Sequence, residues 1–447
     1  MSDFFSQLSS YSINELYLFV ADESNPIVNR TNPLYTVDIK SIMERIDIYE
    51  NIITPIIHGS MVVTDTMGLS KILSTGSCYL KMNISKISKD ESKLSEKISS
   101  YEKIFRVYKQ SKRKKRSENS EVYTFYFCSD EYVLSQQTFV NKGYSDTYSN
   151  IAKNILQEYL AVDNDEIIIN DSFGVKNVTV PSLKPLDALQ WCATRAVNRN
   201  FIPDFLSFEN RDGYNFVSLS QIFKNEAVPI NFNIKNTSIE DGEEGDDSSK
   251  YFSVNDSTIT SQFNLLDSIK KGSFAGSIYG YDLITRTFFK QQINSSYYDS
   301  RIKRLNDENG EKIIPFVANK KGVIPKEAVD SKRTVLVTDS QFRQSRYAVS
   351  KVPTAKLHEP EQSLAHRSAV FSFLSNKKMK MLLPGNLNFT VGMLVDLQYP
   401  KRGLKNNDKN DDTFSGKSLI IAVRHVFMPD KYETLLEISS DSDVINT

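Results

Sequence analysis

Alternation of hydrophobic and polar residues near the N-terminus predicts two β-strands that meet at a corner. Ile46 and Ile48 alternate with polar neighbours, and Met61 and Val63 repeat the pattern beyond Pro55. A period of two gives each strand one face for a core and one for another environment. Because proline cannot donate to a strand ladder, Pro55 is expected at the corner and not inside the sheet.

Further segments before residue 130 share this period. Apolar positions change phase between Ile39 and Ile42, which predicts a bulge in the first of these strands. Five basic residues, Lys112 to Arg116, separate the last two strands, and no aromatic residues interleave with them. A single-strand binder needs such aromatics, so the run is interpreted as a solvated hairpin tip. The predicted strands cover residues 35–50, 58–66, 78–87, 101–109 and 121–128.

Helical periodicity replaces the alternation from Tyr148 onwards. Apolar residues recur at i, i+3, i+4 and i+7 as far as Leu160, and a second helix is predicted from Pro185. Two strands, FLSFE and YNFVSL, follow and are joined by a turn that ends in Asp212 and Gly213. This stretch therefore predicts a compact inserted α+β domain.

Periodicity is lost over residues 224–260, where an acidic loop spans residues 240–247. The loop lacks the order of acidic and glycine residues of a calcium-binding loop, so we interpret it as a solvated linker. A short helix is predicted over residues 263–271. It is followed by one long strand punctuated by Gly276 and Gly280, and antiparallel strands are predicted over residues 377–440.

Composition excludes several classes of function. The 447 residues include 55 basic and 55 acidic side chains, so no net field attracts nucleic acid or an anionic membrane. No apolar run approaches the roughly 18–20 residues that span a bilayer, and the N-terminus lacks the pattern of a secretory signal. Three widely spaced cysteines, Cys78, Cys128 and Cys192, argue for reduced thiols and synthesis in a cytosol.

A search for catalytic and ligand-binding motifs finds none. His358 and His366 are eight residues apart, no H-E-x-x-H or C-x-x-C spacing occurs, and neither a nucleophile elbow nor a phosphate-binding loop is present. His58 and His425 lie on predicted strands and are interpreted as wall or interface residues. We therefore predict no catalytic residues, no cofactor and no metal site, although two carboxylates of a cell-wall hydrolase could still be hidden among 55.

Four segments, in a consistent order, resemble baseplate hub proteins of contractile-tail bacteriophages. These are D-I-Y-E followed by G-S-M-V-V-T-D, then the helix–hairpin segment from residue 181 to 219, then G-M-L-V-D-L and S-L-I-I-A-V-R-H-V-F. The helix–hairpin segment is also similar to VgrG-type spike proteins. The resemblance implies an α+β, mainly β chain with two tube-forming antiparallel β-barrel domains and inserted helical or mixed domains.

The expected domains are a first tube barrel at residues 1–140 and an inserted α+β domain with the acidic linker at residues 141–260. A second tube barrel is expected at residues 261–447, built from strands at about 272–295 and 375–447 and interrupted by a loop and helical region at 300–374. The resemblance implies a homotrimer that forms a pseudo-six-fold ring.

The implied function is structural: a hub in the virion tail baseplate that joins the six-fold tail tube to the three-fold central spike. Its implied partners are the spike, the tail-tube initiator or tube protein, and the tape-measure protein. Phage DNA would pass through the lumen without sequence-specific binding, and no stable membrane insertion is expected. Assembly is expected in the host cytoplasm. The alternatives are a tail-associated cell-wall hydrolase and a tail-tip carbohydrate- or receptor-binding protein.

Overall fold

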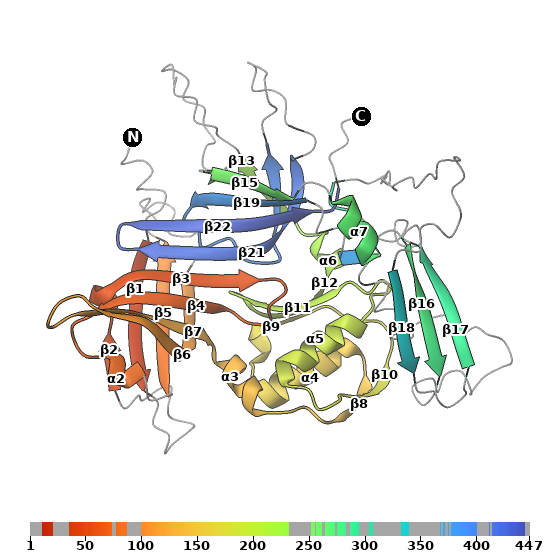
Figure 1. The fold of residues 1–447 in the computed structure, drawn as a ribbon, viewed down its shortest axis with the longest axis horizontal. Helices are drawn as coiled ribbons and strands as arrows, with labels where there is room; N and C mark the ends of the chain where they lie inside the picture. The colour runs from red at the N-terminus through yellow and green to blue at the C-terminus, as the bar shows by residue number, and fades with distance from the viewer. Residues whose placement is uncertain are drawn as a thin grey trace.

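Most strands of the protein belong to one large β-sheet that curls into two barrels (Figure 1). A smaller α+β unit lies beside the place where the barrels meet, and a separate three-stranded sheet lies at one end of the molecule. This computed structural model describes residues 11–20, 35–73, 77–86, 100–231, 252–254, 256–261, 264–272, 275–282, 287–294, 304–306, 332–338, 367, 370–371, 374, 377–399, 411 and 414–442.

The first barrel consists of strands hydrogen-bonded in the order β2-β1-β5-β6-β7-β4-β3, and every neighbouring pair is antiparallel. Alternate side chains of these strands, such as Met61 and Val63 of β4, are buried in one core. The strands therefore wrap around that core as barrel walls do. They are β1 (Tyr11–Val20), β2 (Tyr35–Asp38), β3 (Met43–Asn51), β4 (His58–Asp65), β5 (Cys78–Lys86), β6 (Ser100–Lys115) and β7 (Glu121–Ser129), with η1 (Lys40–Ile42) and α2 (Ser70–Leu73) in the connections.

The second barrel has the order β14-β13-β20-β21-β22-β19-β15. Strand β13 is parallel to both of its neighbours, and the remaining pairs are antiparallel. Its core contains side chains of β19 to β22 and also side chains of the α+β unit. The strands are β13 (Ala227–Asn231), β14 (Phe252–Ser253), β15 (Asp256–Ser261), β19 (Lys377–Pro384), β20 (Leu394–Gln398), β21 (Gly416–Met428) and β22 (Lys431–Ser440).

The two barrels share one strand order. If the strands of each barrel are numbered from one to seven along the chain, both orders read 2-1-5-6-7-4-3. Strands β6 and β21 are therefore equivalent, and so are β3 and β15. The direction of β13, which is opposite to that of its equivalent β1, is the difference in strand direction between them. The prediction of two similar, mainly antiparallel barrels is confirmed.

Strand β21 joins the barrels edge to edge. Residues 416–419 pair with β20, residues 422–427 pair with β3, and β22 pairs along residues 419–428. Since a strand has only two edges and β22 occupies one of them, β20 and β3 follow each other along the same edge of β21. The sheet of the second barrel thus continues directly into the first.

The α+β unit between β7 and β13 has a core of its own. The predicted helix from Tyr148 to Leu160 is present, and its N-cap Thr147 accepts a hydrogen bond from the backbone N–H of Asn150. The predicted helix at Pro185 is also present. The elements are α3 (Asp130–Gln137), β8 (Gly143–Asp146), α4 (Tyr148–Leu160), η3 (Asn164–Glu166), β9 (Ile167–Ile169), β10 (Lys176–Thr179), α5 (Pro185–Arg195), β11 (Phe205–Asn210), β12 (Gly213–Ser218) and α6 (Leu219–Ile222).

A separate sheet with the order β17-β16-β18 contains the segment that we expected in the second barrel at residues 272–295. This segment forms a hairpin of two strands, not one long strand, and β18 pairs in parallel with its first strand. The elements are α7 (Leu265–Lys271), β16 (Ala275–Asp282), β17 (Thr287–Asn294) and β18 (Lys332–Thr338). The second barrel instead takes β13, β14 and β15 from the stretch interpreted as linker.

Two local predictions have different outcomes. The predicted bulge between Ile39 and Ile42 is wrong: a short 3-10 helix turns the chain there, and a register shift follows between Met43 and Arg45. The interpretation of the basic run as a hairpin tip is confirmed, because β6 and β7 pair as far as Lys115 and Glu121. The predicted acidic loop at residues 240–247 and almost all of the region at 300–374 lie outside the described residues.

Candidate functional site: a buried junction of three domains

The β11–β12 hairpin has no solvent-exposed face, since every residue of both strands is buried. Phe205 and Phe216 pack in the core of the α+β unit, whereas Leu206 and Phe208 pack in the core of the second barrel. Successive residues of a strand point to opposite faces, so a short hairpin can serve two cores at once. The predicted aromatic hairpin is therefore a wedge between domains.

Glycine is required at the turn of this hairpin. Gly213 has φ of +132°, and a Cβ there would lie 2.1 Å from the carbonyl oxygen of Glu166. The preceding residues, Asn210, Arg211 and Asp212, carry the polar groups that reach the second barrel. The Asp-Gly turn seen in the sequence thus places polar side chains at the meeting point of three domains.

Glu209 fixes the hairpin to the first barrel. One of its carboxylate oxygens accepts hydrogen bonds from the backbone N–H of Ile57 at 2.7 Å and the hydroxyl of Ser129 at 2.6 Å. The other accepts from the ammonium group of Lys103. Burial alone would lower the pKa of Lys103, but the carboxylates of Glu209 and Glu131 raise it above its ordinary value. Glu209 is thus a buried charge with its partners in place, as a stable fold requires.

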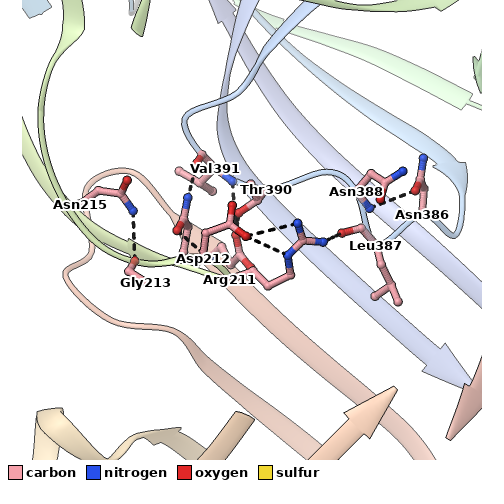
Figure 2. Close-up of polar contacts among 11 residues, drawn as sticks. Arg211, Asp212, Gly213, Asn215, Asn386, Leu387, Asn388, Thr390 and Val391 are labelled. Carbon is pink, nitrogen blue, oxygen red and sulfur yellow. Dashed lines mark hydrogen bonds and ion pairs between the residues drawn. The ribbon is translucent and has the colours of Figure 1, made fainter. Parts of the chain in front are cut away.

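Asn210 and Arg211 connect the hairpin to the second barrel (Figure 2). The side-chain amide of Asn210 donates to the carbonyl oxygen of Val391 at 3.2 Å, and the guanidinium of Arg211 donates to the carbonyl oxygen of Leu387. Figure 2 shows Arg211 lying between Asp212 and Leu387. Both acceptors belong to the loop between β19 and β20, so the hairpin fixes the position of that loop.

Glu50 of β3 completes the junction from the first barrel. The hydroxyl of Thr390 donates to its carboxylate at 2.5 Å and the backbone N–H of Val391 donates at 3.3 Å. Its second oxygen is buried without a hydrogen-bond partner among the described residues. Burial raises the pKa of Glu50 to about 7, against the opposing effect of the two hydrogen bonds. We refer to Glu50, Glu209, Asn210, Arg211 and Thr390 as the junction.

The described histidines lie in barrel walls, as expected. His425 is buried on β21, its Nδ1 atom is 2.9 Å from the hydroxyl of Tyr432, and burial lowers its pKa to about 3. His58 on β4 stacks on Tyr49 with the ring centroids 5.3 Å apart, and burial lowers its pKa. His358 and His366 lie outside the described residues.

The solvent-facing side of the β3–β21 joint is held by ion pairs. Asp47 accepts hydrogen bonds from Arg45 at 2.8 Å and from Arg424 of β21 at 2.9 Å. The guanidinium of Arg424 also lies over the ring of Tyr49, 5.1 Å from its centroid. The joint between the barrels therefore has a charged outer side in addition to the buried junction.

Metal-binding and membrane-spanning features were also sought. Within the described ranges, no three His, Cys, Asp or Glu side chains are grouped closely enough to hold a metal ion. Nor does any helix in these ranges have the length and apolar character needed to cross a bilayer.

Comparison with known proteins agrees with the resemblance read from the sequence. The chain is 26% identical over 357 residues to the "Probable baseplate hub protein gp334" of Vibrio phage KVP40, covering 77% of this chain and 78% of that protein. It is a homologue of a phage baseplate hub protein. No protein-family model matches the chain.

Solved structures share the fold. The tail protein from Neisseria meningitidis MC58 superposes with a TM-score of 0.50 at 11% identity, covering 96% of this chain and 97% of that one. A 43 kDa tail protein of prophage MuSo2 from Shewanella oneidensis gives a TM-score of 0.49 at 9% identity, covering 96% and 99%. At such identities the first of these shows a common fold and nothing more.

Sequence reasoning identified the hairpin but not the polar residues of the junction. Glu50 was part of the D-I-Y-E segment, and Glu209 and Arg211 flank the strand and turn that were predicted correctly. A carboxylate in an otherwise aromatic strand, as in F-L-S-F-E-N, is the signal that could have pointed to a buried charged group.

Proposed function

We propose that this chain is the structural baseplate hub of a contractile phage tail, joining the six-fold tail tube to the three-fold central spike. The observation that supports this most strongly is the common strand order of two barrels in one chain. Three such chains present six nearly equivalent barrels around a three-fold axis. A ring of this kind offers a six-fold surface on one side and a three-fold surface on the other.

The junction suits this role because it fixes the angle between the two barrels. Hydrogen bonds from Asn210, Arg211 and Thr390 link the hairpin, the first barrel and the second barrel across buried surfaces. A ring closes only if each unit is turned by the same angle relative to the next. A rigid junction within the chain sets half of the angles in the ring.

The proposed partners follow from that position in the virion tail. Two further copies of the chain complete the ring, the central spike lies on its three-fold side, and the tail-tube initiator or tube protein lies on its six-fold side. The tape-measure protein and then phage DNA occupy the lumen. Permanent assemblies of this kind bury on the order of 2,000 Å² or more at each interface.

The chain is proposed to have no enzymatic activity. The buried carboxylates of Glu50 and Glu209 are engaged in hydrogen bonds that hold domains together. A surface hollow elsewhere in the described structure, over β19 to β22, is lined by Ser261, Lys377, Lys378, Met379, Leu397, Phe414, Ser415, Ser418, Ile438 and Ser440, and these include no carboxylate. Cleared peptidoglycan in a gel assay, lost on replacing one Asp or Glu, would overturn this part of the proposal.

The direct test of the hub function is the mass and symmetry of the purified protein. Mass photometry should find a species three times the mass of one chain, and negative-stain electron microscopy should show a ring with three-fold symmetry and an open centre. Purified chains that form only dimers, or particles without a lumen, would contradict the proposal.

A further inference from the structure

The β3–β21 joint provides a template for contacts between barrels. In it, the outer edge of the third strand of one barrel pairs antiparallel with the C-terminal half of the sixth strand of the other. The N-terminal half of that sixth strand is occupied on the same edge by the fifth strand, β20. The joint therefore needs one edge strand and one long strand that projects beyond its neighbour.

Both components occur a second time in the chain. Strand β6 is the sixth strand of the first barrel, and residues 100–106 pair with β5 in the same way that β21 pairs with β20. Residues 107–115 continue beyond β5 and pair with β7 only, among the described strands. Strand β15 is the third strand of the second barrel, and β19 is its one described strand partner.

These two edges are accessible to another molecule. From Lys109 to Lys115 the side chains are half-buried or exposed, and Asp256, Thr258 and Ile259 of β15 are exposed. The two strands lie on opposite sides of the β3–β21 joint, with β15 at the top of Figure 1 and β6 at the lower left. An edge strand that is neither paired nor covered is an open template for pairing with another chain.

We propose that residues 256–260 of β15 pair antiparallel with residues 107–115 of β6 in a second copy of this chain. This repeats between chains the joint that β3 and β21 make within each chain. It rests on the proposed hub function, and it specifies which edges close the ring. Because the two edges differ, the contact is head-to-tail, and repetition of such a contact closes a ring when the rotation allows.

The charges on the two strands agree with this direction of pairing. An antiparallel arrangement places Asp256, at the start of β15, near the C-terminal end of β6. That end carries Lys112, Arg113, Lys114 and Lys115. In the internal joint, Asp47 of β3 likewise forms an ion pair with Arg424 of β21. The interaction between chains would therefore be weakened by salt, as exposed ion pairs are.

Disulfide cross-linking between two single-cysteine variants tests the pairing. Thr258 pairs with Lys380, which is exposed, and Lys109 and Ser111 pair with Tyr126 and Thr124, whereas Gln110 pairs with the core residue Phe125. Residues opposite each other in a ladder share a face, so Thr258, Lys109 and Ser111 lie on the outer faces. Gln110 lies on the inner face and is the matched control.

Thr258→Cys mixed with Lys109→Cys or Ser111→Cys should give covalent dimers at least about tenfold faster than Thr258→Cys mixed with Gln110→Cys. A seated edge holds the two sulfurs at millimolar effective concentration and within disulfide geometry. The native thiols of Cys78, Cys128 and Cys192 are buried and should contribute little background. Each single variant alone should remain without cross-links.

The possible results separate this inference from the hub function. A ring seen by electron microscopy without cross-links at either outer position would overturn the strand pairing and leave the hub function in place. Cross-links within Thr258→Cys alone would mean that β15 pairs with itself, which also overturns the pairing. A protein that is monomeric at all concentrations would contradict both proposals.

Discussion

The two barrels have the same strand order but depend on their surroundings to different degrees. The core of the first barrel is built almost entirely from its own strands, with Leu387, Phe427 and Tyr432 added from the second. The core of the second barrel includes Leu206, Phe208 and other residues of the α+β unit. The first barrel is therefore largely self-contained, whereas the second requires the hairpin to complete its core.

The largest effect is expected from removing a hairpin side chain that the second barrel uses. Phe208→Ala should lower the free energy of unfolding by about 3–5 kcal/mol, because it leaves a cavity in a packed core. Hydrogen exchange should increase in residues 377–399 and 414–440. Phe125→Ala, in the core of the first barrel, is the matched variant and should increase exchange mainly in β1 to β7. Equal loss of protection in both barrels for both variants would contradict the difference between them.

Detaching the hairpin from the first barrel should have a somewhat smaller effect. Glu209→Ala removes the acceptor for Ile57, Ser129 and Lys103, and we expect a loss of about 3 kcal/mol, since the ammonium of Lys103 then lacks its partner. Thermal denaturation followed by circular dichroism measures this. Glu158→Ala removes an exposed ion pair with Lys142 and should change stability little. A similar effect of both substitutions would show that Glu209 does not hold the domains together.

The junction should make stability depend on pH through Glu50. Burial raises its pKa in the folded state to about 7, so the folded protein holds a proton that the unfolded chain releases near pH 4.5. This contribution is fully present below pH 4.5 and is lost as the pH rises through 7, by up to about 3 kcal/mol. Glu50→Gln should therefore be less sensitive than the natural protein to a change from pH 5 to pH 8. Identical pH dependence in urea denaturation would rule out a protonated Glu50.

The smallest effect is expected on the exposed side of the same joint. Asp47→Asn weakens the ion pairs with Arg45 and Arg424, and the partly exposed arginines can be hydrated instead. The loss of stability should be below about 1 kcal/mol and should shrink in high salt. A loss as large as that of Glu209→Ala would show that the outer side, and not the buried junction, holds the barrels together.

The sequence was informative where one face of a strand meets a core. Met61 and Val63 in β4, and Val423 and Phe427 in β21, alternate with outward-facing residues, so these strands could be predicted. Strands β13 to β15 are short, and β15 is mostly exposed, so they leave no period to detect. Their place in the second barrel depends on pairing with β19 and β20, which are more than a hundred residues away.

The junction could be predicted only in part for a related reason. Helix periodicity and the Asp-Gly turn located the hairpin, since those are local properties of the chain. The partners of Glu209 lie at Ile57, Lys103 and Ser129, in a different domain. A single sequence does not reveal which distant groups compensate a buried charge, because that depends on how the domains pack.

A cryo-electron microscopy map of the assembled protein, with strands resolved, tests the central claim most directly. The account predicts six barrels in one ring with two alternating joints, β3 on β21 within each chain and β15 on β6 between chains. A ring in which neighbouring chains meet through other elements, with the outer edges of β6 and β15 exposed to solvent, would contradict it.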